Sequence, residues 1–171
     1  MYKDLNQFKE TSLVKHFNST TRDVWWNKKT NKKKEHIIAT VEALICYIPI
    51  AEKKGRDINQ VEKAVGNYHE IPCGIKTRNA SNSPKSETTG DSIIGTKLIG
   101  EIVTEEFKRG NITIDNSEEW IYENLWIWAQ CTVTKEEHKA ENIKRQNHYK
   151  LTLEDKVNFE HYPEKTEILF G

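Results

Sequence analysis

Aromatic rings and cations come together between residues 22 and 34. Trp25 and Trp26 follow Arg22 and are themselves followed by five lysines. Rings that stack on bases, beside ammonium groups that neutralise phosphates, are what a protein needs to bind single-stranded nucleic acid. The alternative is that both Trp side chains pack into the core while the lysines, diluted by acidic neighbours, are solvated. The predicted nucleic-acid-binding residues are Arg22, Trp25, Trp26, Lys28, Lys29, Lys32, Lys33 and Lys34.

A second group of residues has the chemistry of a metal-dependent phosphodiesterase. Carboxylates are preferred ligands of Mg²⁺, and a lysine beside them can orient the attacking water or the phosphate. Asp91, followed by Glu106 and Lys108 with Glu101 between, resembles the Asp then Glu-x-Lys order of metal-dependent nucleases. The resemblance covers residues 91–108 only and departs from that family, because Glu-x-Lys lies here in a predicted helix rather than a strand. An equivalent arrangement with Asp115 lacks a following Glu-x-Lys.

The resemblance implies a metal site and two catalytic roles. Asp91, Glu101 and Glu106 are the expected ligands of Mg²⁺, and Glu106 and Lys108 are the expected catalytic residues. Acidic residues and lysines are common in this chain, so the alternative is a solvated helix face.

Two other motifs are excluded by their residue order, and a third is disfavoured. Residues 90–97 are spaced like a phosphate-binding loop, but that loop needs Lys before Ser or Thr, and the order here is Thr96-Lys97. Residues 69–73 lack the His-x-Glu and the second Cys of a zinc deaminase. A helix-turn-helix over 57–71 is broken by Pro72 at its second helix.

Three Trp residues favour a different class of function, a non-enzymatic protein-interaction module. Trp126 and Trp128 alternate with aliphatic residues in a predicted strand, and Trp120 precedes them. This aromatic face must either be covered by a helix or be exposed, and aromatic residues are enriched at protein interfaces. In this hypothesis an inhibitor or immunity-type protein binds its partner through Trp120, Trp126 and Trp128 and through a long loop. Zero net charge and the absence of a complete catalytic motif favour it.

Apolar periodicity places most of these residues on helices. The predicted helices cover residues 2–17, 37–47, 57–66, 91–110 and about 135–148. Pro49 ends the second, for which a strand is the alternative; Asp57 and Asp91 cap the third and fourth, and the capping box of residues 134–137 opens the last.

Strands and a long loop complete the expected fold. Period-two alternation predicts a strand over 125–133, which we expect to be central in the sheet, and shorter strands over 112–114, 151–153 and 168–170. Residues 72–89 are rich in polar, Gly and Pro residues and read as a loop, exposed over about 74–89. We therefore expect a single α+β domain over 1–171, with helices packed on a small, mostly antiparallel sheet.

Composition limits the remaining possibilities. The chain has 171 residues, 36% hydrophobic and 30% charged, with 26 basic and 26 acidic side chains. A formal net charge of zero means that attraction to nucleic acid must come from local patches. Neither a membrane span nor a secretory signal is seen, and three distant Cys residues do not indicate a disulfide framework, so we expect a cytoplasmic protein with reduced thiols. The expected function is action on DNA or RNA, with a protein-binding module as the alternative.

Overall fold

The computed structural model describes residues 2–67, 70–139 and 168–170. They form two compact units, and the chain passes between them four times. Unit 1 contains the described residues of 1–21, 71–94 and 129–171, and unit 2 contains those of 22–70 and 95–128. The expectation of a single domain stays a prediction.

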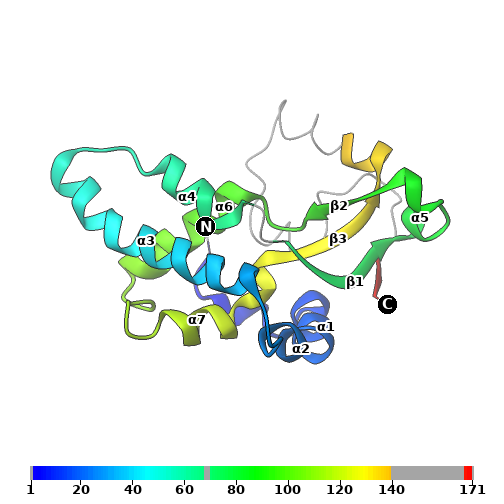
Figure 1. Cartoon of the computed structure of the whole chain (residues 1–171), viewed down its shortest axis with the longest axis horizontal. Helices are drawn as coiled ribbons and strands as arrows, with labels where there is room; N and C mark the ends of the chain where they lie inside the picture. Colours follow the sequence, from blue (N-terminus) through cyan, green and yellow to red (C-terminus); the bar gives the residue numbers. More distant parts are fainter. Residues whose placement is uncertain (1, 68–69, 140–167, 171) are drawn as a thin grey trace. The chain divides into compact units, whose positions relative to one another are not determined.

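Unit 1 is built on a four-stranded mixed sheet in the order β2-β3-β1-β4 (Figure 1). Its strands are β1 (Ile71–Thr77), β2 (Thr88–Ser92), β3 (Ala129–Thr134) and β4 (Ile168–Phe170). The β1–β3 pair is parallel, and the β2–β3 and β1–β4 pairs are antiparallel. The α+β class with a mostly antiparallel sheet is therefore confirmed, as are the internal position of β3 and the strand at 168–170.

Strand β1 corrects the expected loop over 72–89. Ile71, Cys73, Ile75 and Thr77 are buried in alternation with more exposed neighbours, which is the pattern of a half-buried strand. Pro72 and Gly74 are typical of a turn, which is why the sequence predicted a loop. In the structure the segment is held as a strand by its parallel pairing with β3. The rest of the segment holds α5 (Arg78–Ser81) and the 3₁₀-helix η2 (Lys85–Glu87) before β2 begins.

Besides α5 and η2, the described part of unit 1 has three helical segments, two before β1 and one directly after β3. The expected helix over 2–17 is two helices, the 3₁₀-helix η1 (Leu5–Phe8) and α1 (Ser12–Thr20), divided at the Thr11-Ser12 step. The predicted capping box is confirmed, because Thr134 Oγ1 accepts from the Glu137 amide and a Glu137 carboxylate oxygen accepts from the Thr134 amide. The helix that it opens is described over 135–139; its predicted continuation to 148 and the strand over 151–153 lie outside the described residues.

The described part of unit 2 is helical. Its elements are α2 (Arg22–Trp26), α3 (Lys32–Lys54), α4 (Asn59–Gly66), α6 (Thr96–Lys108), α7 (Ser117–Glu123) and the 3₁₀-helix η3 (Leu125–Trp128). Residues 125–128 were expected to open the central strand, and residues 112–114 to form a strand of their own; both expectations are wrong. Continuous burial of all four residues of η3, rather than alternation, explains the first error.

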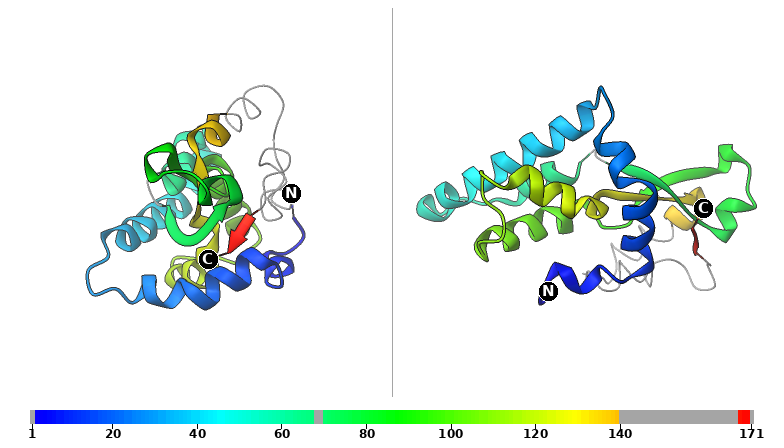
Figure 2. Two further views of the ribbon diagram at one scale, coloured as in Figure 1. Left: turned by 90° about the vertical axis from the view of Figure 1, so that its right-hand side faces the viewer. Right: turned by 90° about the horizontal axis from the view of Figure 1, so that it is seen from below.

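Helix α3 passes through Pro49, where we expected it to end, and continues to Lys54 (Figure 2). Proline removes one backbone hydrogen bond, but Pro49 is on the exposed side, and Ile48 and Ala51 on either side of it are buried. Burial of that apolar stripe therefore sustains the helix, and the helix ends at Gly55, whose φ of 63° is the left-handed conformation of a glycine C-cap.

Helices α4 and α6 pack closely against each other through glycines (Figure 1). A Cβ atom at Gly66 would lie 2.6 Å from the Thr96 Cα atom, and one at Gly100 would lie 2.2 Å from the Glu62 carbonyl oxygen. Gly66 is the last residue of α4, as expected, and it also permits this approach. The N-cap of α6 is Gly95, not Asp91 as expected, because Asp91 belongs to β2.

Candidate nucleic-acid interface

The segment between α2 and α3 positions the predicted binding residues. Asn31 is the N-cap of α3, with its Oδ1 accepting from the Lys34 amide at 2.9 Å. Its Nδ2 donates to the Trp25 carbonyl oxygen at 2.7 Å. One side chain thus ties the end of α2 to the start of α3, and the lysines on both sides of it are held in one region of unit 2.

The two adjacent Trp residues have different environments. Trp25 is 6% exposed and belongs to the core, so its predicted role in stacking on bases is wrong for this conformation. Trp26 is half-buried. The Lys34 ammonium lies 4.2 Å from the Trp26 ring centroid, and the Tyr122 ring meets the Trp26 ring edge-on at 5.5 Å. Trp26 is therefore a fixed ring with an exposed portion.

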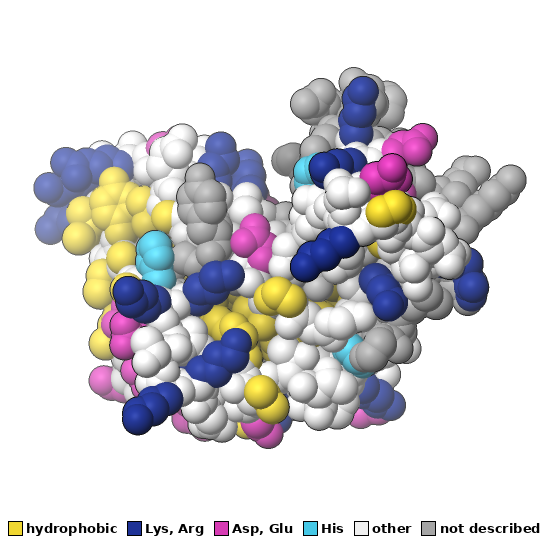
Figure 3. Space-filling view, turned by 45° about the vertical axis from the view of Figure 1, so that its right-hand side comes forward, with side chains coloured by type: hydrophobic (Ala, Val, Ile, Leu, Met, Phe, Trp, Pro, Cys, Tyr) yellow, Lys and Arg dark blue, Asp and Glu magenta, His cyan; other side chains and the backbone are white. Residues whose placement is uncertain are grey.

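Four lysines that follow Trp26 in the sequence are exposed: Lys28, Lys29, Lys32 and Lys33. Of these, Lys33 donates from Nζ to the Glu70 carbonyl oxygen at 3.4 Å. Lys34 is half-buried, and its Nζ also donates to the Trp26 carbonyl oxygen at 3.3 Å. On the face of the molecule that Figure 3 shows, Lys and Arg side chains project at several separate places, with acidic side chains among them. We call the following set the basic-aromatic surface: Arg22, Trp26, Lys28, Lys29, Lys32, Lys33, Lys34 and Tyr122.

Arg22 is held by neighbours within unit 2. Its Nε lies 3.6 Å from Asp23 Oδ1, and its Nη1 lies 4.0 Å from Glu123 Oε2. The guanidinium carbon is 4.5 Å from the Tyr122 ring centroid. The Tyr122 hydroxyl donates to Asp23, and this hydrogen bond raises the pKa of Tyr122 above its ordinary value. Arg22 therefore joins α2 to α7 rather than projecting as a free cation.

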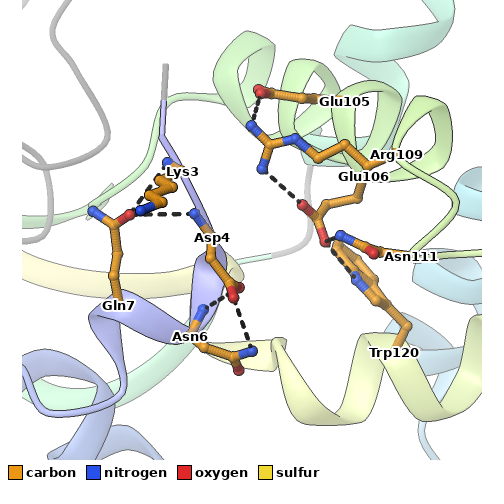
Figure 4. A network of polar contacts seen from close by, with 9 residues as sticks. All are labelled: Lys3, Asp4, Asn6, Gln7, Glu105, Glu106, Arg109, Asn111 and Trp120. Carbon is orange, nitrogen blue, oxygen red and sulfur yellow. Dashed lines mark hydrogen bonds and ion pairs between the residues drawn. The ribbon is translucent and has the colours of Figure 1, made fainter.

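Glu106, the central residue of the predicted metal and catalytic site, is engaged in a structural network (Figure 4). Its side chain is 5% exposed, and Oε1 lies 3.5 Å from Arg109 Nη1. Its Oε2 accepts from Asn111 Nδ2 at 3.2 Å and from Trp120 Nε1 at 3.4 Å. Arg109 also pairs with Glu105. Three donors around one buried carboxylate are the usual arrangement of a stabilising site.

The other predicted residues of the metal site also have protein partners. Glu101 pairs with Lys97 at 3.7 Å along α6, and Lys108 pairs with Glu52 at 3.5 Å. Asp91 belongs to unit 1, where its Oδ1 lies 3.5 Å from His138 Nδ1. Within the described ranges, no group of three or more His, Cys, Asp or Glu residues is arranged to hold a metal ion. Binding of Mg²⁺ and the catalytic roles stay predictions.

The predicted aromatic docking surface is not exposed. Trp120 is 7% exposed, and Trp126 and Trp128 are each 2% exposed. Trp128 Nε1 donates to the Val65 carbonyl oxygen at 3.0 Å, and Trp120 donates to Glu106 as described above. These side chains are core residues, which is the covered alternative for the aromatic face, and binding of a partner through the three Trp residues stays a prediction.

Sequence reasoning missed Tyr122, which comes from a helix almost one hundred residues after Trp26, so no local spacing could have linked the two.

The expectation of structural thiols concerned Cys46, Cys73 and Cys131. Burial raises the pKa of Cys73 to about 11, which keeps that thiol protonated at neutral pH.

Comparison with protein-family models, with curated proteins and with solved structures finds no match for this chain. Among the helices that the structure describes, none is both long and apolar enough to cross a membrane.

Proposed function

We propose that the chain binds single-stranded nucleic acid, without sequence selectivity, through the basic-aromatic surface. The observation that carries the proposal is the half-buried Trp26 ring with Lys34 against it, followed within seven residues of the sequence by four exposed lysines. Ammonium groups neutralise phosphates and release counterions, and an exposed aromatic ring stacks on any base. Neither contact depends on base identity.

The positioning of the surface supports this function. Lys34 and Tyr122 hold the Trp26 ring, so little rotamer freedom remains to be lost when a base stacks on it. The Asn31 cap fixes the first turn of α3, from which Lys32 and Lys33 project. A prepared ring with exposed cations in the same segment favours a flexible single strand over a duplex, whose bases are already stacked.

Hydrolysis is a separate and untested hypothesis. The predicted catalytic pair, Glu106 and Lys108, lies on α6, and neither residue belongs to the basic-aromatic surface. The proposal is accordingly one of binding, and nuclease activity is assayed independently of it.

The test is the binding of a labelled oligothymidylate of about 20 nucleotides, measured by fluorescence anisotropy as salt is varied. If the four exposed lysines each contact a phosphate, the slope of log K against log salt is about −3, because each contact on a single strand contributes about −0.7. The Lys32→Ala/Lys33→Ala variant makes the slope shallower by about 1.4.

Two matched controls make the result specific. Lys53→Ala/Lys54→Ala removes the same charge from exposed positions at the other end of α3 and should leave affinity within about twofold. Trp26→Leu should weaken binding to oligothymidylate by about tenfold and binding to an abasic oligomer of equal length much less, since stacking is worth about 1 to 3 kcal/mol per base. An equal loss of affinity from the Lys32/Lys33 and the Lys53/Lys54 substitutions would mean that binding depends on total charge and not on this surface. Absence of binding by the native chain would reject the proposal.

A further inference from the structure

Two exposed carboxylates lie beside Arg22 of the basic-aromatic surface. The Asp23 and Glu123 side chains are 62% and 54% exposed, whereas the Arg22 side chain between them is 20% exposed. Both carboxylates are within 4.0 Å of the Arg22 guanidinium, and Asp23 also accepts a hydrogen bond from Tyr122. Arg22 thus has acidic neighbours on both α2 and α7.

We propose that Asp23 and Glu123 are intramolecular competitors of phosphate at Arg22, so that they set an upper limit on the affinity for nucleic acid. This inference rests on the proposed function and concerns the regulation of the same surface. A carboxylate presents oxygens to a guanidinium much as a phosphate does, and both anions use the same N–H donors. While the carboxylates hold Arg22, a phosphate must displace them to reach it.

The carboxylates also act at a distance. Asp23 and Glu123 also repel a phosphate that binds at the lysines, with a strength that salt screens over a Debye length of roughly 8 Å at physiological ionic strength. Both effects disappear when Asp23 and Glu123 lose their charge. In that neutralised form, Arg22 is available to contact a phosphate, as the sequence predicted.

The test uses the full chain and the oligothymidylate anisotropy assay. Asp23→Asn/Glu123→Gln removes both charges, and asparagine keeps an oxygen that can accept from the Tyr122 hydroxyl. We expect affinity at about 50 mM salt to rise about three- to tenfold and the slope against log salt to become steeper by about 0.7, the value for one additional phosphate contact.

A mutant cycle assigns the gain to Arg22. Arg22→Gln should cancel the gain in the Asp23→Asn/Glu123→Gln background, so that it lowers affinity more there than in the native background. Asp115→Asn/Glu118→Gln is the matched control, because it changes the net charge equally at exposed positions before and at the start of α7. Far-UV circular dichroism confirms that each variant is folded.

The outcomes separate the two proposals. Lysine-dependent binding with no gain on neutralisation, or with the same gain in the control, overturns the competitor role and leaves the proposed function standing. No binding by either the native chain or the neutralised variant overturns both. A gain that survives Arg22→Gln assigns the effect to general repulsion and overturns competition at Arg22.

Discussion

Glu62 and Thr104 form a buried pair between α4 and α6. The Thr104 hydroxyl donates to Glu62 Oε2 at 2.9 Å, and the Glu62 residue is 5% exposed. Burial raises the pKa of Glu62, and nearby Glu101 adds to this effect, whereas the hydrogen bond and the lysines of α6 oppose it. The ionised form of Glu62 is therefore less favourable in the folded protein than in the unfolded chain.

The raised pKa predicts how stability depends on pH. A group whose pKa rises on folding contributes stability below its unfolded value, near 4.5, and loses that contribution as pH rises through the folded value. Glu62→Gln is neutral at every pH, so it should raise the free energy of unfolding by about 1 kcal/mol at pH 7.5 and change it little at pH 4. Urea unfolding at both pH values measures the difference, and an equal effect at both would contradict this role of the charge.

Glu106 and Lys108 should differ sharply in their contribution to stability. Glu106→Ala leaves Arg109, Asn111 and Trp120 without their shared acceptor and should cost about 2 to 4 kcal/mol. Lys108→Ala removes a pair whose side chains are both more than half exposed and should cost less than about 1 kcal/mol. Urea unfolding measures both, and similar costs would show that the Glu106 network is weak.

This difference decides how any nuclease assay is interpreted. Loss of cleavage in Glu106→Ala alone could follow from unfolding, whereas loss in the folded Lys108→Ala variant would support the predicted catalytic role. At the residue scale, the sequence indicated which side chains could bind a metal ion, a phosphate or a base. It did not reveal their partners, because the contact between Glu106 and Trp120 depends on how α6 and α7 pack.

At the scale of elements, the α4–α6 contact provides a direct test of packing. Alanine is a better helix former than glycine by up to about 1 kcal/mol, but a Cβ at Gly100 would overlap the backbone of Glu62. Gly100→Ala should therefore destabilise the protein by about 2 to 3 kcal/mol, by thermal or urea unfolding. Gly95→Ala is the control, because a Cβ there meets no atom within 4 Å, and an equal loss in both variants would contradict the packing argument.

The presence of most helices was predicted from apolar periodicity, but the ends of α3 and the start of α6 were not, and neither was strand β1. The helices α3, α4 and α6, the strand β4 and the capping box at Thr134 follow local rules of apolar spacing or capping. Strand β1 was missed because Pro72 and Gly74 signal a turn, whereas its partner β3 lies more than fifty residues later in the chain. Local propensity was overridden by a long-range contact.

At the scale of the whole molecule, all five Trp residues lie in unit 2: Trp25, Trp26, Trp120, Trp126 and Trp128. Trp fluorescence therefore reports on unit 2, whereas far-UV circular dichroism reports on both units. The two signals together test the prediction of a single domain without any substitution.

We expect the two unfolding curves to coincide. The chain passes between the units four times, so neither unit is a contiguous segment that can fold as an independent piece of chain. Unfolding in urea should give one midpoint by fluorescence and by circular dichroism. Separated midpoints would instead identify two domains, and the earlier transition would show which is less stable.

The first turn of α3 carries Lys32, Lys33 and Lys34, where the backbone amides already present positive charge, whereas Lys53 and Lys54 in its last turn suit the opposite end. Glu35 is the acidic residue of that first turn and offsets only part of the three positive charges, so the start of the helix is electrostatically less favourable than its end. A phosphate bound at the N-terminus of α3 would offset these positive charges and so stabilise the first turn of the helix. Amide hydrogen exchange over residues 32–35 should then slow when nucleic acid binds, so the exchange rate of the first turn of α3 reports binding at the surface.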